Sequence, residues 1–143
     1  MERIYRSLAG KMRGREYLMT DTPSFLIVDD EPGMCWILEQ VVKRSGYNCL
    51  CALSGQEAMA IAETTDVLLV FLDAKLPDIE GLELARQIRG CLPDSNIVMI
   101  SGYFYKDDDT IKKALSSGLI RHFISKPFNH EEILQVVQDC LPD

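Results

Sequence analysis

The chain has 143 residues, which suits a single domain, and its 47% apolar and 26% charged residues are typical of a globular protein. Its net charge of -7 argues against a general nucleic-acid binder, because phosphate contacts supply most of the affinity of such proteins. No apolar run approaches the roughly 20 residues of a membrane-spanning helix. Five cysteines without disulfide or zinc spacing favour a reducing, cytoplasmic compartment.

The first 23 residues differ in charge from the rest of the chain. They carry five basic and three acidic residues, so this piece has a charge of +2 and the remainder has -9. Two glycines and Pro23 would interrupt any helix in it, and a mobile tail is therefore favoured over a docking or membrane-binding segment. Met19 is an alternative start, which would leave residues 1–18 untranslated. The predicted domain spans residues 24–143.

Strand-like and helix-like segments alternate from Ser24 onward. Short apolar runs and β-branched residues predict five strands, at residues 25–28, 47–52, 67–72, 97–100 and 122–125. Apolar residues at helical spacing predict a helix after each strand, over about 34–45, 55–64, 81–89, 109–117 and 130–141. Capping boxes are expected at Ser54 with Glu57 and at Asn129 with Glu132. Three glycines are expected to end helices: Gly46, Gly90 and Gly118.

Five strands that alternate with five helices predict a doubly wound α/β domain, in which right-handed crossovers place helices on both faces of a parallel sheet. Functional groups in such sheets gather beyond the carboxyl ends of the strands. Asp29 and Asp30 follow the first strand, and Asp73 follows the third. Ser101 follows the fourth strand and Lys126 the fifth. These side chains are therefore expected at one edge of the sheet.

The residue types at this edge suit phosphoryl chemistry. Clustered carboxylates repel one another unless a cation neutralises them, and oxygen ligands in a hydrated site favour Mg²⁺. A lysine and a hydroxyl group can hold phosphoryl oxygens, and a carboxylate can itself accept the phosphoryl group. Taken alone, Asp29 and Asp30 could be ordinary acids at a helix start. Their combination with Asp73 favours a site.

Residues 24–141 resemble the receiver domain of two-component response regulators. The resemblance is carried by five segments, IVDDE at 27–31, LD at 72–73, LPDIEGLEL at 76–84, SG at 101–102 and FISKPF at 123–128. It implies a (βα)5, flavodoxin-like three-layer sandwich, similar to chemotaxis regulators, with the strand order 2-1-3-4-5. It also implies a signalling module rather than an enzyme, because only self-phosphorylation and autodephosphorylation are expected.

The resemblance assigns roles to single residues. It makes Asp73 the phosphoacceptor, supplied by a sensor histidine kinase or a histidine phosphotransfer protein. It makes Asp29, Asp30, Asp73 and the main-chain carbonyl of Lys75 the ligands of Mg²⁺. Lys126 would contact the phosphoryl group and link the site to the response.

The remaining implied positions concern switching and rate. Ser101 and Phe123 would be the hydroxyl and aromatic switch residues, acting on the face formed by the fourth helix, the fifth strand and the fifth helix. The main chain at Ala74 and Gly102 would contact the phosphate, and the bond before Pro127 would be cis. Lys75 and Tyr103 depart from the commonest family patterns, so both side chains are expected to affect the lifetime of the acyl phosphate.

The sequence leaves the output open. The chain could act on an unknown downstream protein, relay its phosphoryl group, or be the receiver portion of a longer transcriptional regulator. A phosphorylation-linked homodimer is possible, and no direct nucleic-acid or membrane contact is expected. A haloacid dehalogenase-type phosphatase would need an Asp where Lys75 stands. A nucleotide- or flavin-binding protein would need a glycine- or hydroxyl-rich loop in place of residues 29–32.

Several other residues have structural explanations. Residues 107–109, all Asp, suit a helix start, whereas the aromatic run 103–105 suits an exposed partner patch. His122 and His130 show no metal-ligand spacing, and Trp36 is expected to be partly buried. Cys35, Cys49 and Cys51 are interpreted as core residues, with Cys91 and Cys140 more exposed.

Overall fold

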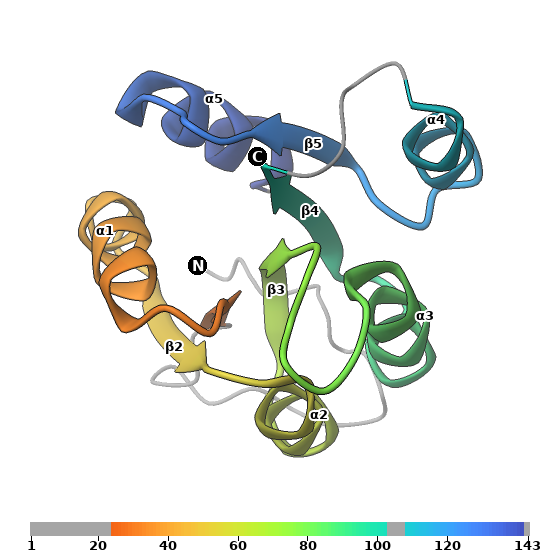
Figure 1. Ribbon diagram of the computed structural model, residues 1–143. Coiled ribbons are helices and arrows are strands. Elements are labelled where there is room, and N and C mark those ends of the chain that lie inside the picture. The colour runs from red at the N-terminus through yellow and green to blue at the C-terminus, as the bar shows by residue number, and fades with distance from the viewer. Residues whose placement is uncertain (1–23, 103–107, 142–143) are drawn as a thin grey trace.

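The computed structural model describes residues 24–102 and 108–141 (Figure 1). The predicted tail at 1–23 and the aromatic run at 103–105 lie outside these ranges. The strands are β1 (Ser24–Val28), β2 (Asn48–Ala52), β3 (Val67–Asp73), β4 (Asn96–Ser101) and β5 (His122–Ser125). The helices are α1 (Pro32–Lys43), α2 (Gly55–Thr64), α3 (Gly81–Cys91), α4 (Asp109–Ser116) and α5 (His130–Cys140).

The five strands form one parallel sheet in the order β2-β1-β3-β4-β5. Helices α1 and α5 cover one face, and α2, α3 and α4 cover the other (Figure 1). The expected doubly wound fold and its strand order are confirmed. Both central strands, β1 and β3, therefore end at the same edge of the sheet, between the two helical layers.

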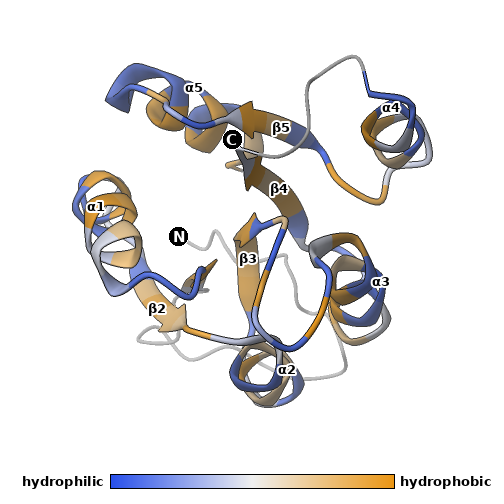
Figure 2. Cartoon of the chain, viewed as in Figure 1, coloured by the Kyte–Doolittle hydropathy of each residue, from blue (hydrophilic) through white to orange (hydrophobic). Residues whose placement is uncertain are grey.

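The core consists of two apolar layers, one on each face of the sheet. Successive residues of β1 alternate between them, with Leu26 packed toward α2 and α3 and Phe25 packed toward α1 and α5. All five residues of β1 are buried, which explains its continuous apolar run. In Figure 2 the strands are mainly hydrophobic, whereas the helices that cover them are hydrophobic on part of their surface and hydrophilic on the rest. The sheet is thus a rigid base for the loops at its carboxyl edge.

The two expected capping boxes have different outcomes. At α5 the box is complete, because the Asn129 side chain accepts from the backbone of Glu132 and the Glu132 side chain accepts from the backbone of Asn129. At α2 only one of the two hydrogen bonds of the capping box forms. Ser54 accepts from the backbone of Glu57, but the Glu57 carboxylate accepts from Leu53 instead of Ser54.

The expected end of α3 at Gly90 is wrong. The helix continues to Cys91, and the backbone N–H of Leu92 still donates to the carbonyl of Ile88 at 2.7 Å. A glycine ends a helix where it adopts a positive φ, and Gly90 does not. Pro93 supplies the stop instead, because proline disfavours a helical residue before it. The glycines after α1 and α4, Gly46 and Gly118, do have positive φ values of 83° and 81°.

None of the helices within residues 24–102 and 108–141 combines the length and apolarity that a membrane crossing requires.

Candidate functional site

Three carboxylates meet beyond the ends of β1 and β3. The two strands pair directly, with Val28 opposite Leu72, so Asp29 and Asp30 after β1 become neighbours of Asp73, the last residue of β3. Asp29, Asp30 and Asp73 each offer a carboxylate oxygen, and these oxygens lie within 4.8 Å of one another. The structure therefore brings together the three acids that the sequence placed at this edge.

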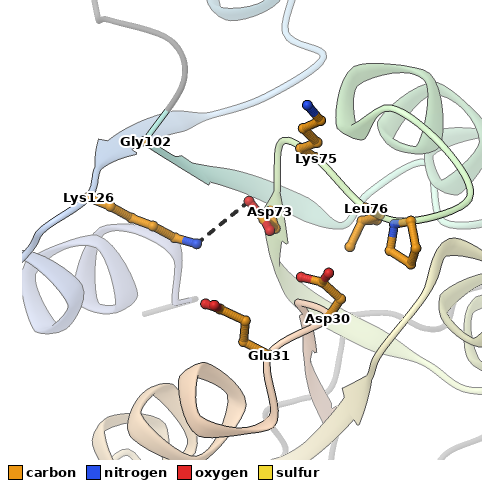
Figure 3. A pocket seen from close by; sticks show the side chains of 8 residues that line it. Asp30, Glu31, Asp73, Lys75, Leu76, Gly102 and Lys126 are labelled. Carbon is orange, nitrogen blue, oxygen red and sulfur yellow. Dashed lines mark ion pairs between the residues drawn. The ribbon is translucent and has the colours of Figure 1, made fainter.

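The three carboxylates differ in their exposure to water. Asp29 is 3% exposed and Asp73 is 8% exposed, whereas Asp30 is exposed. Asp30 and Asp73 line an open pocket of about 550 Å³ (Figure 3), together with Glu31, Lys75, Leu76, Pro77, Gly102 and Lys126. Asp73 lines this open pocket, so a group from another molecule can approach its carboxylate.

Lys126 follows β5 directly, and its side chain reaches the carboxylates from that strand. Its Nζ lies 3.3 Å from Asp29 Oδ2 and 3.7 Å from Asp73 Oδ1, the second contact being the dashed line in Figure 3. Its backbone N–H donates to the carbonyl of Ser101 at 2.9 Å, which continues the pairing of β5 with β4. The Lys126–Pro127 bond is cis, as the resemblance implies. One lysine thus contacts two buried carboxylates.

The environment of Asp73 opposes its ionisation. Burial raises the pKa of Asp73 above its ordinary value, and the charges of Asp29 and Asp30 raise it further. Lys126 lowers this pKa, as does the backbone N–H of Lys75, which hydrogen-bonds the carboxylate. The positive charge of Lys126, which contacts Asp29 and Asp73, balances only part of the negative charge of the three acids, so the site favours an added cation.

Asp29 is held rigidly by its own turn. Its Oδ1 accepts from the backbone N–H of Glu31 at 2.9 Å, and its backbone N–H donates to the carbonyl of Ala52 at 3.1 Å. Because one oxygen faces the turn and the other faces Lys126, the orientation of this carboxylate is defined before any ligand binds.

The loop between β3 and α3 is fixed by a contact that sequence reasoning missed. The Asp78 carboxylate accepts from the backbone N–H groups of Gly55 and Gln56, at 2.9 and 3.0 Å, at the start of α2. These groups would otherwise lack a helical partner. Asp78 and Gly55 are 23 residues apart, so no local pattern predicts their contact.

The other predicted positions lie around this centre. Ser101 is fully buried at the end of β4, and Phe123 is 4% exposed in the core layer beneath α4. The backbone N–H of Ala74 donates to the carbonyl of Ile100 at 3.2 Å, while Gly102 lines the pocket. In Figure 3 the side chain of Lys75 points away from Asp73. Tyr103, the second predicted rate-modulating residue, lies outside the described residues.

The three acids suit a hard divalent cation. All their donor atoms are carboxylate oxygens, which Mg²⁺ and Ca²⁺ prefer over nitrogen or sulfur ligands. Mg²⁺ commonly keeps several waters and needs few protein ligands, and the exposure of Asp30 leaves the site open to water. The residues present therefore fit a magnesium ion.

Some expectations about exposure are wrong. Cys51 is exposed because it lies on the edge strand β2, and Cys140 is 5% exposed because the last turn of α5 packs against the core. Trp36, on the outer side of α1, is 61% exposed and so is only partly buried, as expected. Asp108 and Asp109 do start a helix, since the Asp108 side chain accepts from the backbone of Thr110.

Comparison with known proteins identifies close relatives. The family model for the response regulator receiver domain matches residues 25–138. Sporulation initiation phosphotransferase F of Bacillus subtilis is 34% identical over 117 residues, which are 82% of this chain and 92% of that protein. The alkaline phosphatase synthesis transcriptional regulatory protein PhoP of the same species is 33% identical over 76% of this chain, but only 44% of that protein is covered.

Solved structures agree with these sequence matches. A receiver domain protein from Methanospirillum hungatei has a TM-score of 0.74 and 28% identity, covering 82% of this chain and 92% of that one. The response regulator TrrA of Thermotoga maritima, crystallised in complex with Mg²⁺ and BeF, has a TM-score of 0.71 and 32% identity. That match covers 83% of this chain and 99% of that one.

Proposed function

The chain belongs to the response regulator receiver domain family, and we propose that it accepts a phosphoryl group on Asp73. Receiver domains are signalling domains that interact with histidine kinases or phosphotransfer proteins. The observation that carries the proposal is the convergence of Asp29, Asp30, Asp73 and Lys126 beside one open pocket, which Asp30, Asp73 and Lys126 line. The donor is the phosphohistidine of a sensor histidine kinase or a histidine phosphotransfer protein.

In the proposed reaction, an Asp73 carboxylate oxygen attacks the phosphorus atom of the donor. The new O–P bond forms as the N–P bond of the phosphohistidine breaks, and the electron pair stays on the imidazole, which takes up a proton. Asp29 and Asp30, together with Asp73 and the carbonyl of Lys75, would hold Mg²⁺. The ion supplies positive charge that reduces repulsion between the carboxylates and the phosphoryl oxygens.

The other residues of the site would act after transfer. Lys126 contacts Asp73 in this structure, and its ammonium group would pair with a phosphoryl oxygen there. The main chain at Gly102 and Ala74 would supply further contacts, for which the Ala74 N–H must be shared with Ile100. Ser101 would respond to the phosphoryl group, and Phe123 would pass the change to the surface formed by α4, β5 and α5.

Two outputs remain candidates for this surface. A role as a relay intermediate is supported by the match to sporulation initiation phosphotransferase F, because that match covers 92% of the phosphotransferase. A receiver portion of a longer transcriptional regulator is supported by the match to 44% of PhoP. Return of the phosphoryl group from Asp73 to a purified histidine phosphotransfer domain would favour the relay. In either case we place the reaction in the cytoplasm, where five unpaired cysteines stay reduced.

The test is intact mass spectrometry of the full chain after incubation with acetyl phosphate and Mg²⁺. We expect one added phosphoryl group, which disappears with EDTA and in the Asp73→Asn variant. Asp94→Asn is the matched control, because Asp94 is exposed and distant from the three acids, and it should be phosphorylated normally.

If no adduct is detected, beryllofluoride shows whether the adduct is too short-lived to observe or does not form. Beryllofluoride mimics the bound phosphoryl group without transferring it. Trp36 lies on α1, the helix that follows Asp29 and Asp30 in the chain, so we expect its fluorescence to report binding. An adduct that persists in Asp73→Asn contradicts the proposal. Absence of both an adduct and a beryllofluoride-dependent fluorescence change contradicts it as well.

A further inference from the structure

A second group of potential metal ligands lies at the edge of the sheet opposite the acids. His122 is the first residue of β5, and Asp139 and Cys140 end α5. One donor atom of each lies within 4.8 Å of the other two. The His122 Nε2 atom is 2.6 Å from Asp139 Oδ2. Because Lys126 follows the other end of β5, this cluster is separated from the proposed phosphoryl site by the length of the strand.

Besides the contact between His122 and Asp139, hydrogen bonds to main-chain carbonyls hold the cluster in place. The Arg121 guanidinium donates to the main-chain carbonyl of Asp139 at 3.2 Å. The Asn96 side-chain amide donates to the carbonyl of Cys140 at 3.3 Å, and its oxygen accepts from Arg121. These contacts fix the end of α5 against the start of β4 and β5. The three potential ligands are therefore held close together by contacts within the protein.

The donor set is chemically different from that of the three acids. It combines an imidazole nitrogen, a carboxylate oxygen and a thiol sulfur, which are the ligand types of Zn²⁺ sites, whereas Mg²⁺ requires oxygen ligands. Asp139 and Cys140 also lie in the last turn of α5, where the helix dipole favours a cation. The side chains of His122 and Asp139 are 33% and 48% exposed, so the cluster is open to water on one side.

We propose that His122, Asp139 and Cys140 bind one Zn²⁺ or a similar borderline-soft divalent ion, with the fourth position open to water or to a ligand from a partner. Binding exchanges the S–H bond of Cys140 for a metal–sulfur bond, and the proton passes to the buffer. His122 binds through an unprotonated ring nitrogen, so its Nε2 contact with Asp139 is given up when Nε2 is the ligand. Arg121 Nε lies 3.4 Å from Asp139 Oδ2, so the ion displaces this contact or uses the other oxygen. A bound ion would tie β5 to α5 beside Phe123. The proposal does not depend on phosphorylation of Asp73.

The experiment is a Co²⁺ titration of the full chain in saturating Mg²⁺, which occupies the oxygen site. Co²⁺ replaces Zn²⁺ in such sites and gives a thiolate charge-transfer band and tetrahedral visible bands. We expect saturation at one equivalent and loss of the bands on adding Zn²⁺. Binding should weaken by about tenfold or more in His122→Gln and in Asp139→Asn, because each removes a ligand.

The matched control variants remove a histidine and a cysteine that lie outside the cluster. His130→Gln removes an exposed histidine at the other end of α5, and Cys51→Ala removes an exposed thiol of β2, so both should bind as the unchanged chain does. Cys140→Ala should abolish the charge-transfer band, but its site is buried, so the two exposed variants decide the outcome. The proposal is overturned if no band forms, if it survives in His122→Gln and Asp139→Asn, or if Cys51→Ala removes it.

Discussion

Asp73 combines a buried carboxylate with the charges of two neighbouring acids, and this combination has a consequence for folding. The raised pKa of Asp73 means that its ionised form is less favourable in the folded chain than in the unfolded chain. Ionisation therefore lowers the free energy of unfolding above the folded-state pKa. This loss in the free energy of unfolding disappears as the pH falls through the folded-state pKa toward the ordinary value of 3.8, because below that value the carboxyl group is protonated in both states.

We therefore expect Asp73→Asn to raise the free energy of unfolding at neutral pH by about 1 kcal/mol. The gain should shrink as the pH falls toward 4, because the wild-type carboxyl group then becomes neutral too. Urea denaturation in EDTA at several pH values measures it, with Asp94→Asn as the control that shows little change. A gain that is independent of pH, or a loss at neutral pH, would contradict the electrostatic explanation.

Lys75 and Tyr103 are the residues expected to set the lifetime of the acyl phosphate. The side chain of Lys75 lies at the pocket and points away from Asp73, so it is placed to affect the approach of water rather than the acceptor itself. Removing either side chain should change the hydrolysis rate about threefold or more, equivalent to roughly 0.7 kcal/mol in activation free energy. No direction is predicted.

The measurement is the decay of the phosphorylated mass after removal of acetyl phosphate from Lys75→Ala and Tyr103→Ala. Lys43→Ala removes a lysine on α1 that pairs with Glu39 outside the site, and its decay should match the unchanged chain. Equal decay rates in all four proteins would exclude a role for both residues.

At the scale of elements, α3 meets β3 so closely that only glycine fits at the contact. A Cβ on Gly81 would lie 2.7 Å from the Ala74 Cα and 2.7 Å from the Asp73 carbonyl oxygen. Both are backbone atoms, which cannot rotate away as a side chain can. The backbone N–H of Gly81 also donates to the carbonyl of Ala74 at 2.8 Å, so the helix start and the acceptor strand move together.

Gly81→Ala and Gly90→Ala should accordingly have opposite effects within one helix. The first should destabilise the fold by about 1–3 kcal/mol and slow phosphorylation, because the backbone at Asp73 must shift. The second should stabilise it by about 0.5–1 kcal/mol, because a Cβ on Gly90 meets nothing within 4 Å. Thermal unfolding and acetyl phosphate labelling test both. A Gly81→Ala chain as stable as the original would show that the contact can relax.

At the scale of the whole molecule, we propose that the domain begins at residue 24. The family match starts at residue 25, and β1 is buried between β2 and β3 from Ser24 onward. The backbone N–H of Ser24 donates to the carbonyl of Asp66 at 3.1 Å, so the first residue of the strand is already part of the fold.

A chain that starts at Pro23 after an initiating methionine should keep its melting temperature within about 2 °C and its labelling by acetyl phosphate. Differential scanning calorimetry and intact mass measure the two properties. A chain that starts at Val28 is the control, and it should not fold because it lacks most of β1. A large drop in melting temperature on removing only residues 1–22 would move the domain boundary toward the N-terminus.

The sequence alone determined the fold class, the strand edge that carries the chemistry and the acids at that edge. These follow from local information, because buried parallel strands are continuous apolar runs and the residue after each strand must lie at its carboxyl edge. The place of Asp29, Asp30, Asp73 and Lys126 at this edge therefore follows from the sequence. The sequence does not determine where α3 ends. Gly90 and Pro93 are both possible stop signals, and only the backbone conformation decides between them.

Only the tertiary structure decided which residues distant in sequence meet. Asp78 caps α2 across 23 residues, and the cluster at the opposite edge joins His122 to Asp139 and Cys140 across 17 residues and more. His122 has no ligand spacing in the sequence, because its neighbours reach it only when α5 folds back along β5. The burial of Cys140 has the same origin. Contacts between elements depend on how the helices pack on the sheet. Patterns along the chain predict single helices and strands, but they do not predict this packing.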